Sequence, residues 1–450
     1  MKLGFSELPD LNRLEFGSIK RLHESVALSL LGCSAHFTYD TYSELVYLEE
    51  IKYDAHKKTY EFIFKNDCCY SDSSPLNPKD WADSILRNQK LGTGIHFNPS
   101  IELDGPPVVK GRSVFLKAHE PSPGFVRLTG KTESSVLHPS YLKATGSDHF
   151  TKAPSSGPYR CESFAANDRM ILRKNMNFLG QHAITQPESL TWQKFASDEL
   201  LFEALFDGYS DFIFPRSPVN QHLADPATKG YQALEMFSQT YILTPLIRNL
   251  ESIGSEYQTP STRIRLGKWL RANLGKPSWL TQTLLQSDGL GRLSDDVFST
   301  SVQRPKKFSL AFLSTPMTNL IVDALLDTGL EIDVINVSNF DDLFSTTECE
   351  FALTWSDYSA FDPYIALYNG INKERPMIAD QDGALALKLN SIQATKNSAA
   401  KDALYKELHS HILKDAMCIP LAKCTDRYYA NDKVDFSNML GFCFWMLKNR

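Results

Sequence analysis

The segment between Phe308 and Val337 restricts the fold of this chain more than any other part of the sequence. It begins with a mainly apolar run, Phe308–Leu313, and ends with Glu331–Val337, which is rich in β-branched residues, and both patterns are typical of strands. Between them, Thr318–Asp327 carries apolar side chains at helical spacing, and Gly329 ends this helix. A strand, a helix and a strand with short links form a βαβ unit, which predicts a parallel sheet with a right-handed crossover.

The elements after this unit extend the same picture. A third strand is predicted at Phe351–Trp355, and the helix Ala399–Lys414 has an apolar stripe that suits packing over a sheet. Before the unit, Arg263–Leu270 belongs to another amphipathic helix, which Pro260 precedes. The later half of the chain is therefore expected to be an α/β structure.

The first half is richer in strands. Thr59–Phe64 places three aromatic side chains on one face, as in a half-buried strand. Asn77 is a good N-cap and Pro78 suits the first helical position, so a helix is predicted from there to about Asn88. Further elements are predicted as a strand at 113–117 and as a strand, a helix ending at Gly208 and a strand between 188 and 214.

A tight turn that leads into a hairpin is predicted at Ser155-Ser156-Gly157-Pro158-Tyr159-Arg160. Gly157 is expected to supply backbone freedom and Pro158 to fix φ, and the second strand follows at Met170–Asn175. Tyr159 is interpreted as a structural residue packed under this hairpin.

Length and charge limit the class of protein. A chain of 450 residues exceeds one ordinary core, so two lobes are expected. The net charge of −6, without a concentrated basic surface, argues against nucleic acid as a partner. No run reaches the roughly 18 apolar residues that a membrane span needs. The start at Met1–Phe5 lacks the apolar region of a signal peptide and is interpreted as the first strand of the fold.

Motifs for catalysis or metal binding are not found in the sequence. Eight cysteines include no CxxC pair, so they are interpreted as incidental thiols, with a Cys418–Cys424 disulfide as the alternative. His409 and His411 are two apart on a predicted helix, do not share a face, and are interpreted as surface residues. A P-loop lysine, Gly-x-Ser-x-Gly and His-Glu-x-x-His are absent. We therefore predict a binding protein, not an enzyme, with no cofactor and no metal.

Several of these segments resemble landmarks of one protein family. Ser156-Gly157-Pro158-Tyr159 resembles its G-[TS]-G-P-Y turn, which precedes a strand ending in Arg-Asn, and Asp72 to Leu76 before a capped helix resembles its D-G-x-P-L segment, with Ser73 in place of glycine. The helix end at Gly208 to Asp211 also fits. The family is the bacterial extracellular solute-binding proteins, family 5, which deliver peptides, nickel chelates or sugars to ABC importers. The resemblance runs in order along nearly the whole chain.

The resemblance implies an α/β, two-lobe fold of the periplasmic-binding-protein type, type II, of the large peptide-binding class, with mixed sheets and a hinge. Lobe I is expected at 1–240 plus 418–450, with an extra β-rich subdomain at about 35–155. Lobe II is expected at 241–417. Closure of the lobes over a guest would be a rigid-body motion.

The resemblance also implies where the ligand binds. The strand Phe351–Trp355 ends in a polar, aromatic-rich loop, and ligands of open α/β sheets bind at such carboxyl ends. The family's loop supplies an aspartate that pairs with the α-ammonium of a peptide, a role that falls on Asp357. The spacing departs by about one residue, so Asp362 competes for it, and both acids have a second interpretation as caps of the loop and of the following helix. The complete set of implied contacts is Asp357, Trp355, Tyr358, Asp362, Glu133, Ser134 and Ser135.

The function implied is capture of a small ligand, with a peptide ahead of a nickel chelate or a sugar, for delivery to an ABC permease in the membrane. A monomer in the periplasm or another extracytoplasmic space is expected, with its export segment removed ahead of Met1. The alternative is a cytosolic regulator that uses the same fold as a sensor. For the residues of the first lobe, 133–135, a solvated loop is the competing interpretation.

Overall fold

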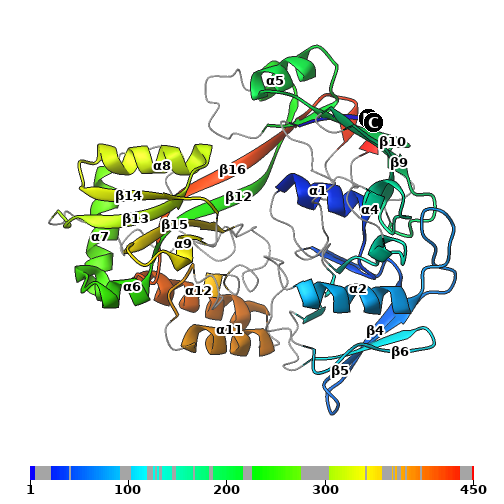
Figure 1. The fold of residues 1–450 in the computed structure, drawn as a ribbon, viewed down its shortest axis with the longest axis horizontal. Coiled ribbons are helices and arrows are strands. Elements are labelled where there is room, and N and C mark those ends of the chain that lie inside the picture. The colour runs from blue at the N-terminus through cyan, green and yellow to red at the C-terminus, as the bar shows by residue number, and fades with distance from the viewer. Residues whose placement is uncertain are drawn as a thin grey trace. The chain divides into compact units, whose positions relative to one another are not determined.

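The computed structural model of the protein (Figure 1) describes residues 1–5, 22–39, 42–91, 103–118, 125–126, 129–130, 134–143, 148–165, 168–181, 186–215, 226–274, 304–339, 342–356, 367, 370–371, 377–380, 383–395, 398–435 and 448–449. The chain divides into two compact units. Unit 1 consists of Met1–Arg216, Asn220–Met236 and Arg427–Arg450, and unit 2 of Ser217–Val219 and Phe237–Asp426. The lobe boundaries given above, including the β-rich subdomain, stay predictions.

Unit 1 contains a small antiparallel sheet that one helix covers. In spatial order its strands are β4 (Leu48–Asp54), β5 (Thr59–Phe64), β7 (Ser113–Lys117) and β6 (Val108–Lys110). The predicted strand at β5 is confirmed, with Tyr60, Phe62 and Phe64 on its buried side. The helix α2 (Pro78–Leu91) begins after Asn77 as predicted. Its Trp81 packs on the sheet, with ring centroids 4.9 Å from Phe62 and 5.9 Å from Phe64.

A second set of strands in unit 1 follows the order β11, β1, β10, β9, β8. These strands are β1 (Lys2–Phe5), β8 (Tyr159–Ala165), β9 (Arg169–Lys174), β10 (Ser189–Lys194) and β11 (Phe212–Phe214). The first strand of the chain lies parallel to β10 and β11, while β9 pairs antiparallel with β8 and β10. The predicted hairpin, β8 and β9, is confirmed. The predicted strand, helix and strand are β10, α5 (Asp198–Phe206) and β11, and Gly208 after α5 has the left-handed φ of +74°.

Shorter elements complete unit 1. They are α1 (Leu22–Leu31), β2 (Phe37–Tyr39), β3 (Tyr42–Glu44), η2 (Tyr141–Lys143), α4 (Asp148–Thr151), η4 (Pro226–Lys229), β17 (Val434–Asp435) and β18 (Lys448–Asn449). The described residues of α1 from Val26 to Leu31 are all buried in the core of this unit. Tyr159 is also fully buried, and its hydroxyl donates to the carbonyl of Pro187 at 3.1 Å, as expected of a structural residue.

Unit 2 contains the predicted βαβ unit. Its elements are α6 (Ile247–Ser252), η5 (Glu256–Gln258), α7 (Pro260–Asn273), β13 (Phe308–Leu313), α8 (Pro316–Asp327), β14 (Ile332–Val337), α9 (Asp342–Ser345), β15 (Phe351–Ser356), α11 (Ala384–Ala394) and α12 (Ser398–Lys414). Both β14 and β15 lie parallel to β13, which confirms the parallel sheet. The helix α8 starts at Pro316, two residues before its predicted start, because Thr315 and Thr318 form a reciprocal capping box.

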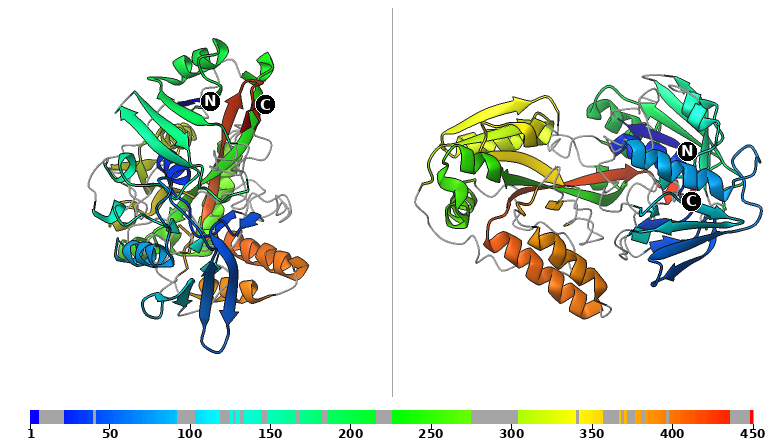
Figure 2. Two further views of the ribbon diagram at one scale, coloured as in Figure 1. Left: turned by 90° about the vertical axis from the view of Figure 1, so that its right-hand side faces the viewer. Right: turned by 60° about the horizontal axis from the view of Figure 1, so that its bottom comes forward.

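Helices cover both faces of this sheet. Side chains of α7 and α8 form one apolar cluster with β13 and β15, including Leu266, Ile321 and Leu310. On the other face, Ile242 of the sheet joins the cluster of α11 and α12, which lie side by side (Figure 2). The two-faced burial explains why these strands read as continuous apolar runs.

Two long strands divide their residues between the units. The strand β12 (Gln232–Pro245) passes from unit 1 into unit 2 after Met236, and β16 (Ile419–Ala430) returns after Asp426. In unit 2, β12 pairs antiparallel with β15, and in unit 1 the end of β16 pairs antiparallel with β11. The length of these two strands was not predicted from the sequence.

Candidate functional site

The carboxyl end of β15 is the place where the sequence predicts ligand binding. Trp355 is half-buried there and lies directly opposite Tyr241 of β12, with ring centroids 5.8 Å apart at 36°. Both rings pack against the apolar cluster of α7 and α8. Asp357, Tyr358 and Asp362 lie outside the described residues. Their predicted contacts with a ligand stay predictions.

Hydroxyl groups on the opposite face of these strands were missed by sequence reasoning. The hydroxyls of Thr244 and Thr354 are 2.8 Å apart, and Thr244 also donates to the carbonyl of Met377 at 3.0 Å. Thr240 lies opposite Ser356, is fully buried, and makes no hydrogen bond through its hydroxyl. The threonines at alternate positions 240 and 244 were the available signal. The hydroxyls of Thr240, Thr244 and Thr354 therefore lie near the end of β15, where ligand binding is predicted.

The predicted contacts of unit 1 lie in a buried segment. Ser134 and Ser135 have no exposed surface, so the alternative interpretation as solvated loop residues is wrong for both. The carbonyl of Ser134 accepts from the Trp81 indole at 2.9 Å, and Ser135 forms a β-bridge with Ser34. Glu133 lies outside the described residues. Contact of any of the three with a ligand stays a prediction.

This segment, residues 134–137, is held from two sides. On one side, the amide of Val136 donates to the carbonyl of Cys33 at 2.9 Å. On the other side, the amide of Leu137 donates to the Ser84 hydroxyl of α2 at 2.9 Å, and the Leu137 carbonyl accepts from Tyr70 at 3.2 Å. The backbone of the segment is thereby fixed on the core of unit 1.

The turn at Ser155–Pro158 is fixed by contacts with the end of α1. Gly157 does not have a positive φ, so the expected need for backbone freedom is wrong. A Cβ at this position would instead lie 2.5 Å from backbone atoms of Leu31 and Gly32. Asn175 secures the turn through its side-chain amide, which donates to the Gly157 carbonyl at 2.8 Å. The glycine of this motif is therefore required because two backbone segments approach closely.

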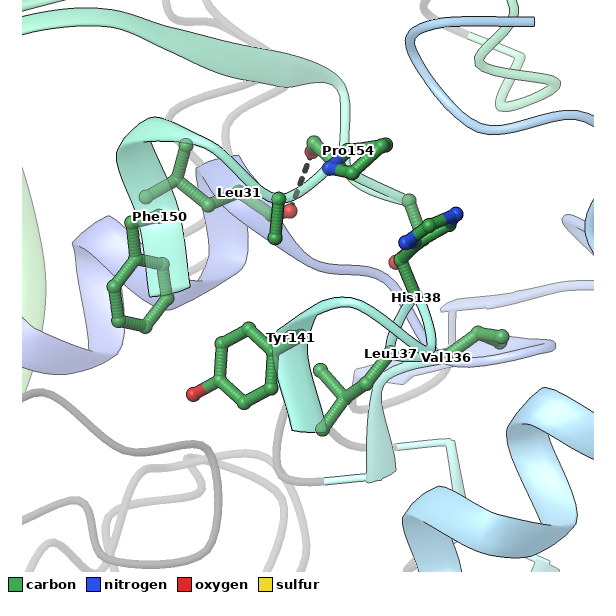
Figure 3. A pocket seen from close by; sticks show the side chains of 10 residues that line it. Leu31, Val136, Leu137, His138, Tyr141, Phe150 and Pro154 are labelled. Carbon is green, nitrogen blue, oxygen red and sulfur yellow. Dashed lines mark hydrogen bonds between the residues drawn. The ribbon is translucent and has the colours of Figure 1, made fainter. Parts of the chain in front are cut away.

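A small cavity lies between this turn and the segment 134–137 (Figure 3). Leu31, His138, Tyr141 and Phe150 are among its lining residues. Ser155 also lines it and donates to the Leu31 carbonyl. Its volume is about 20 Å³, which has room for about one water molecule. This cavity is too small for the peptide or chelate that the resemblance implies.

The thiols and histidines of the described residues have structural roles. Cys68, Cys69, Cys161, Cys349 and Cys418 are free. Because the Cys418 thiol is free, the alternative disulfide with Cys424 is not formed. His411 forms an exposed pair with Asp415 at 3.2 Å, whereas His409 is buried, and burial lowers its pKa to about 4. The interpretation of His409 as a surface residue is wrong because His409 lies on the buried side of α12.

The described residues contain neither a metal-binding cluster nor a membrane-spanning helix. Within the ranges given above, no group of three or more His, Cys, Asp or Glu side chains is arranged to hold a metal ion. Among the same residues, no helix has the length and apolar character needed to cross a membrane.

Similarity to known proteins agrees with this fold. Residues 45–248 match the model of the bacterial extracellular solute-binding proteins, family 5 Middle. The resemblance to family 5 is confirmed. No curated protein matches the chain at the sequence level.

Solved structures of solute-binding proteins are similar to the whole chain. NikA from Brucella suis in complex with Fe(III)-EDTA has a TM-score of 0.80 at 14% identity, and 100% of each chain is covered. AgaA from A. tumefaciens R10 in complex with agropinic acid has 0.75 at 14%, covering 100% of this chain and 98% of that one. DppA from Helicobacter pylori in complex with the peptide STSA has 0.74 at 14%, with the same coverage. The predicted fold class, a type II periplasmic-binding-protein fold, is confirmed.

Proposed function

We propose that this protein is a solute-binding protein that captures a small ligand and presents it to an ABC importer. The observation that carries the proposal is the family 5 match over residues 45–248, joined to full-length similarity with binding proteins for a peptide, agropinic acid and a metal chelate. The division into two compact units supports it, because two strands, β12 and β16, are the crossings about which the units would close.

The proposed ligand is a peptide whose α-ammonium group pairs with a carboxylate after β15. Removing a cation from water costs several kcal/mol unless a counter-charge and hydrogen bonds replace its hydration. Asp357 follows β15 directly and is the proposed partner, with Trp355 and Tyr358 as walls and Asp362 as the competing acid. Ser134 and Ser135, with Glu133, are the proposed contacts of unit 1. Main-chain hydrogen bonds to an extended peptide would make binding tolerant of sequence.

We place this function outside the cytoplasm, with a monomeric protein and a membrane permease as its partner. The family model describes extracellular solute-binding proteins, which supports that location. A cytosolic sensor with the same fold is the alternative. Mapping the start of the translated gene distinguishes an exported binding protein from a cytosolic sensor. An export signal upstream of Met1 is expected only for the exported protein.

The first experiment is calorimetric titration with short peptides, each used with a free and with an acetylated N-terminus. The wild-type protein is expected to bind only the free form. Asp357→Asn should weaken that binding by about 30-fold or more, since a buried partner of a charge pair costs 2–5 kcal/mol when lost. Asp362→Asn tests the competing acid: if Asp357 is the partner of the α-ammonium, the Asp362 variant keeps its affinity, and a loss confined to Asp362→Asn would transfer the role to Asp362. Equal binding of acetylated peptides would contradict the proposed role of Asp357.

Mass spectrometry of material released from the purified protein tests the class of ligand. Peptides in the released material are the expected result. If the released material is a nickel or iron chelate, or an opine-like solute, that compound replaces the peptide as the proposed ligand. The proposed role in transport is then unchanged. Absence of both a released ligand and a calorimetric response to peptides and chelates would contradict the proposed function.

A further inference from the structure

His36 lies in the core of unit 1 and holds a neighbouring segment through a single ring nitrogen. Its Nε2 donates to the carbonyl of Val126 at 2.8 Å and is 3.4 Å from the Thr129 hydroxyl. A carbonyl oxygen accepts only, so this nitrogen carries the proton of the neutral ring. The side chain of Thr129 itself donates to the Val126 carbonyl at 2.9 Å.

The other ring nitrogen of His36 has no hydrogen-bond partner. Nδ1 is fully buried, and the residue has no exposed surface. The ring stacks on Phe62 of β5, with centroids 5.7 Å apart, and meets the edge of Trp81 of α2 at 6.3 Å. A proton added at Nδ1 would therefore place a charge among aromatic rings with no acceptor for the new N–H.

Ionisable groups on the surrounding elements have partners elsewhere. Glu61 of β5 accepts from Ser113, Asp80 of α2 accepts from Tyr70, and Glu44 of β3 accepts from the amide of Gln181. Arg87 of α2 lies over the ring of Tyr141, 5.4 Å from its centroid. The described residues of the segment held by His36, namely Phe125, Val126, Thr129 and Gly130, carry no ionisable side chain. Burial is accordingly the main cause that lowers the pKa of His36, to about 4.

Ser34 links the residues that His36 contacts to one of the predicted ligand contacts. Ser34, two residues before His36, donates to the Thr129 carbonyl at 2.5 Å and forms the β-bridge with Ser135. Residues 33–36 thus contact Val126 and Thr129 as well as Ser135 and Val136. One small cavity is lined by Ser34 and Gly130, and the other lies beside residues 134–137.

We propose that His36 is an acid-sensitive positioning residue, which holds Val126 and Thr129 on the core of unit 1, beside the predicted ligand contact Ser135, only while its ring is neutral. Protonation moves a proton from water to Nδ1, and the charged ring is then stable only in water, so the contacts of His36 with Val126 and Thr129 open. The ligand consequence, release at acid pH, rests on the proposed function; the local opening does not.

The test is hydrogen exchange of the full chain without ligand, measured as protection factors from pH 7 to pH 4.5. With a ring pKa of about 4 when buried and 6.5 in water, opening linked to one proton should become about 20-fold more frequent between pH 7 and pH 5. Peptides covering 125–130 should lose protection by this factor, while peptides covering β4 and β5 should not. A uniform loss throughout unit 1, or no loss, would overturn the proposal.

Two variants distinguish the titration of His36 from that of the other buried histidine, His409. His36→Gln keeps an N–H donor for the Val126 carbonyl and does not titrate, so its protection over 125–130 should be independent of pH. His409→Gln removes the other buried histidine, in unit 2, and should retain the wild-type loss. Persistence of the loss in His36→Gln would overturn the proposal, and if that variant does not fold, the contrast between segments in the wild type still decides. Peptide titrations at pH 7 test the proposed function separately, since His36 is neutral there.

Discussion

At the scale of single residues, Arg263 shows how one buried side chain organises unit 2. Only 5% of it is exposed, and its guanidinium donates to the carbonyls of Ala416, Tyr257 and Gln258 at 2.7–3.0 Å. Ala416 follows the end of α12 by two residues, and the other two carbonyls belong to η5, so Arg263 joins α7 to η5 and to the turn after α12. Burial lowers the pKa of Arg263, and Asp415 nearby opposes that effect.

Replacing this side chain should destabilise unit 2. Arg263→Met leaves several buried carbonyls without donors, so we expect a loss of about 3 kcal/mol in the free energy of unfolding. Arg265→Met, on the same helix and half-exposed, is the control and should cost less than about 1 kcal/mol. Urea denaturation of both variants measures the difference. Equal losses in the free energy of unfolding would show that the carbonyl contacts of Arg263 do not stabilise unit 2 beyond the contribution of a half-exposed arginine.

Gly157 gives a second prediction at this scale. Gly157→Ala would place its Cβ 2.5 Å from backbone atoms of α1, which cannot move as a flexible side chain can. We expect a loss of at least about 2 kcal/mol, or failure to fold. Gly208→Ala has open space around its Cβ but a φ of +74°, so only about 1 kcal/mol is expected. Thermal unfolding compares the two, and a larger effect at Gly208 would contradict the close-approach explanation.

At the scale of elements, α2 fixes the position of the predicted ligand-contact segment. The Ser84 hydroxyl is fully buried and accepts the amide of Leu137, and Trp81 holds the carbonyl of Ser134. The helix therefore acts on both ends of residues 134–137 from one face. Its start at Asn77 and Pro78 sets which residues reach that face.

Removing the Ser84 hydroxyl should destabilise residues 134–137 more than it destabilises α2. Ser84→Ala leaves the buried Leu137 amide unpaired, which should cost about 1–3 kcal/mol. Ser252→Ala removes an exposed hydroxyl at the end of α6 and should have little effect. Hydrogen exchange at Leu137, together with chemical denaturation, checks this. Unchanged protection at Leu137 in Ser84→Ala would contradict the role given to α2.

At the scale of the whole molecule, the two units share one response to acid. His36 in unit 1 and His409 in unit 2 are both buried, and in each the pKa falls from 6.5 to about 4 because burial disfavours the charged ring. A lowered pKa means that the folded state prefers the neutral form. The stability from each ring is therefore complete above pH 6.5 and declines as the pH falls toward 4.

The expected cost of acid is up to about 3 kcal/mol for each histidine at pH 4, since one pKa unit is worth 1.36 kcal/mol. Denaturation by urea at pH 7, 5.5 and 4 should show this loss in the wild-type protein. The double variant His36→Gln and His409→Gln should lose less stability over the same pH range. The difference from the wild type should equal the combined contribution of the two histidine rings. An identical pH dependence in the wild type and the double variant would contradict the prediction.

Much of the fold was predictable because local patterns and tertiary structure agree. The alternation in Thr59–Phe64, the cap at Asn77 and the βαβ pattern after Phe308 each matched the structure within about two residues. Local chemistry determines such elements, since capping groups and periodic apolar faces act over a few neighbouring residues. The order of these landmarks also predicted the resemblance to the solute-binding proteins of family 5.

The sequence by itself thus determined many of the elements, the fold class and the resemblance to family 5. Only the tertiary structure decided which polar residues are inside: that His409 faces the core, that Ser134 and Ser135 are buried, and that Gly157 is needed for a close backbone approach. It also decided that β12 and β16 are long strands shared by the two units. The physical reason is that burial and close contact depend on partners that are distant in the chain, as His36 and Val126 are, and no local pattern records them.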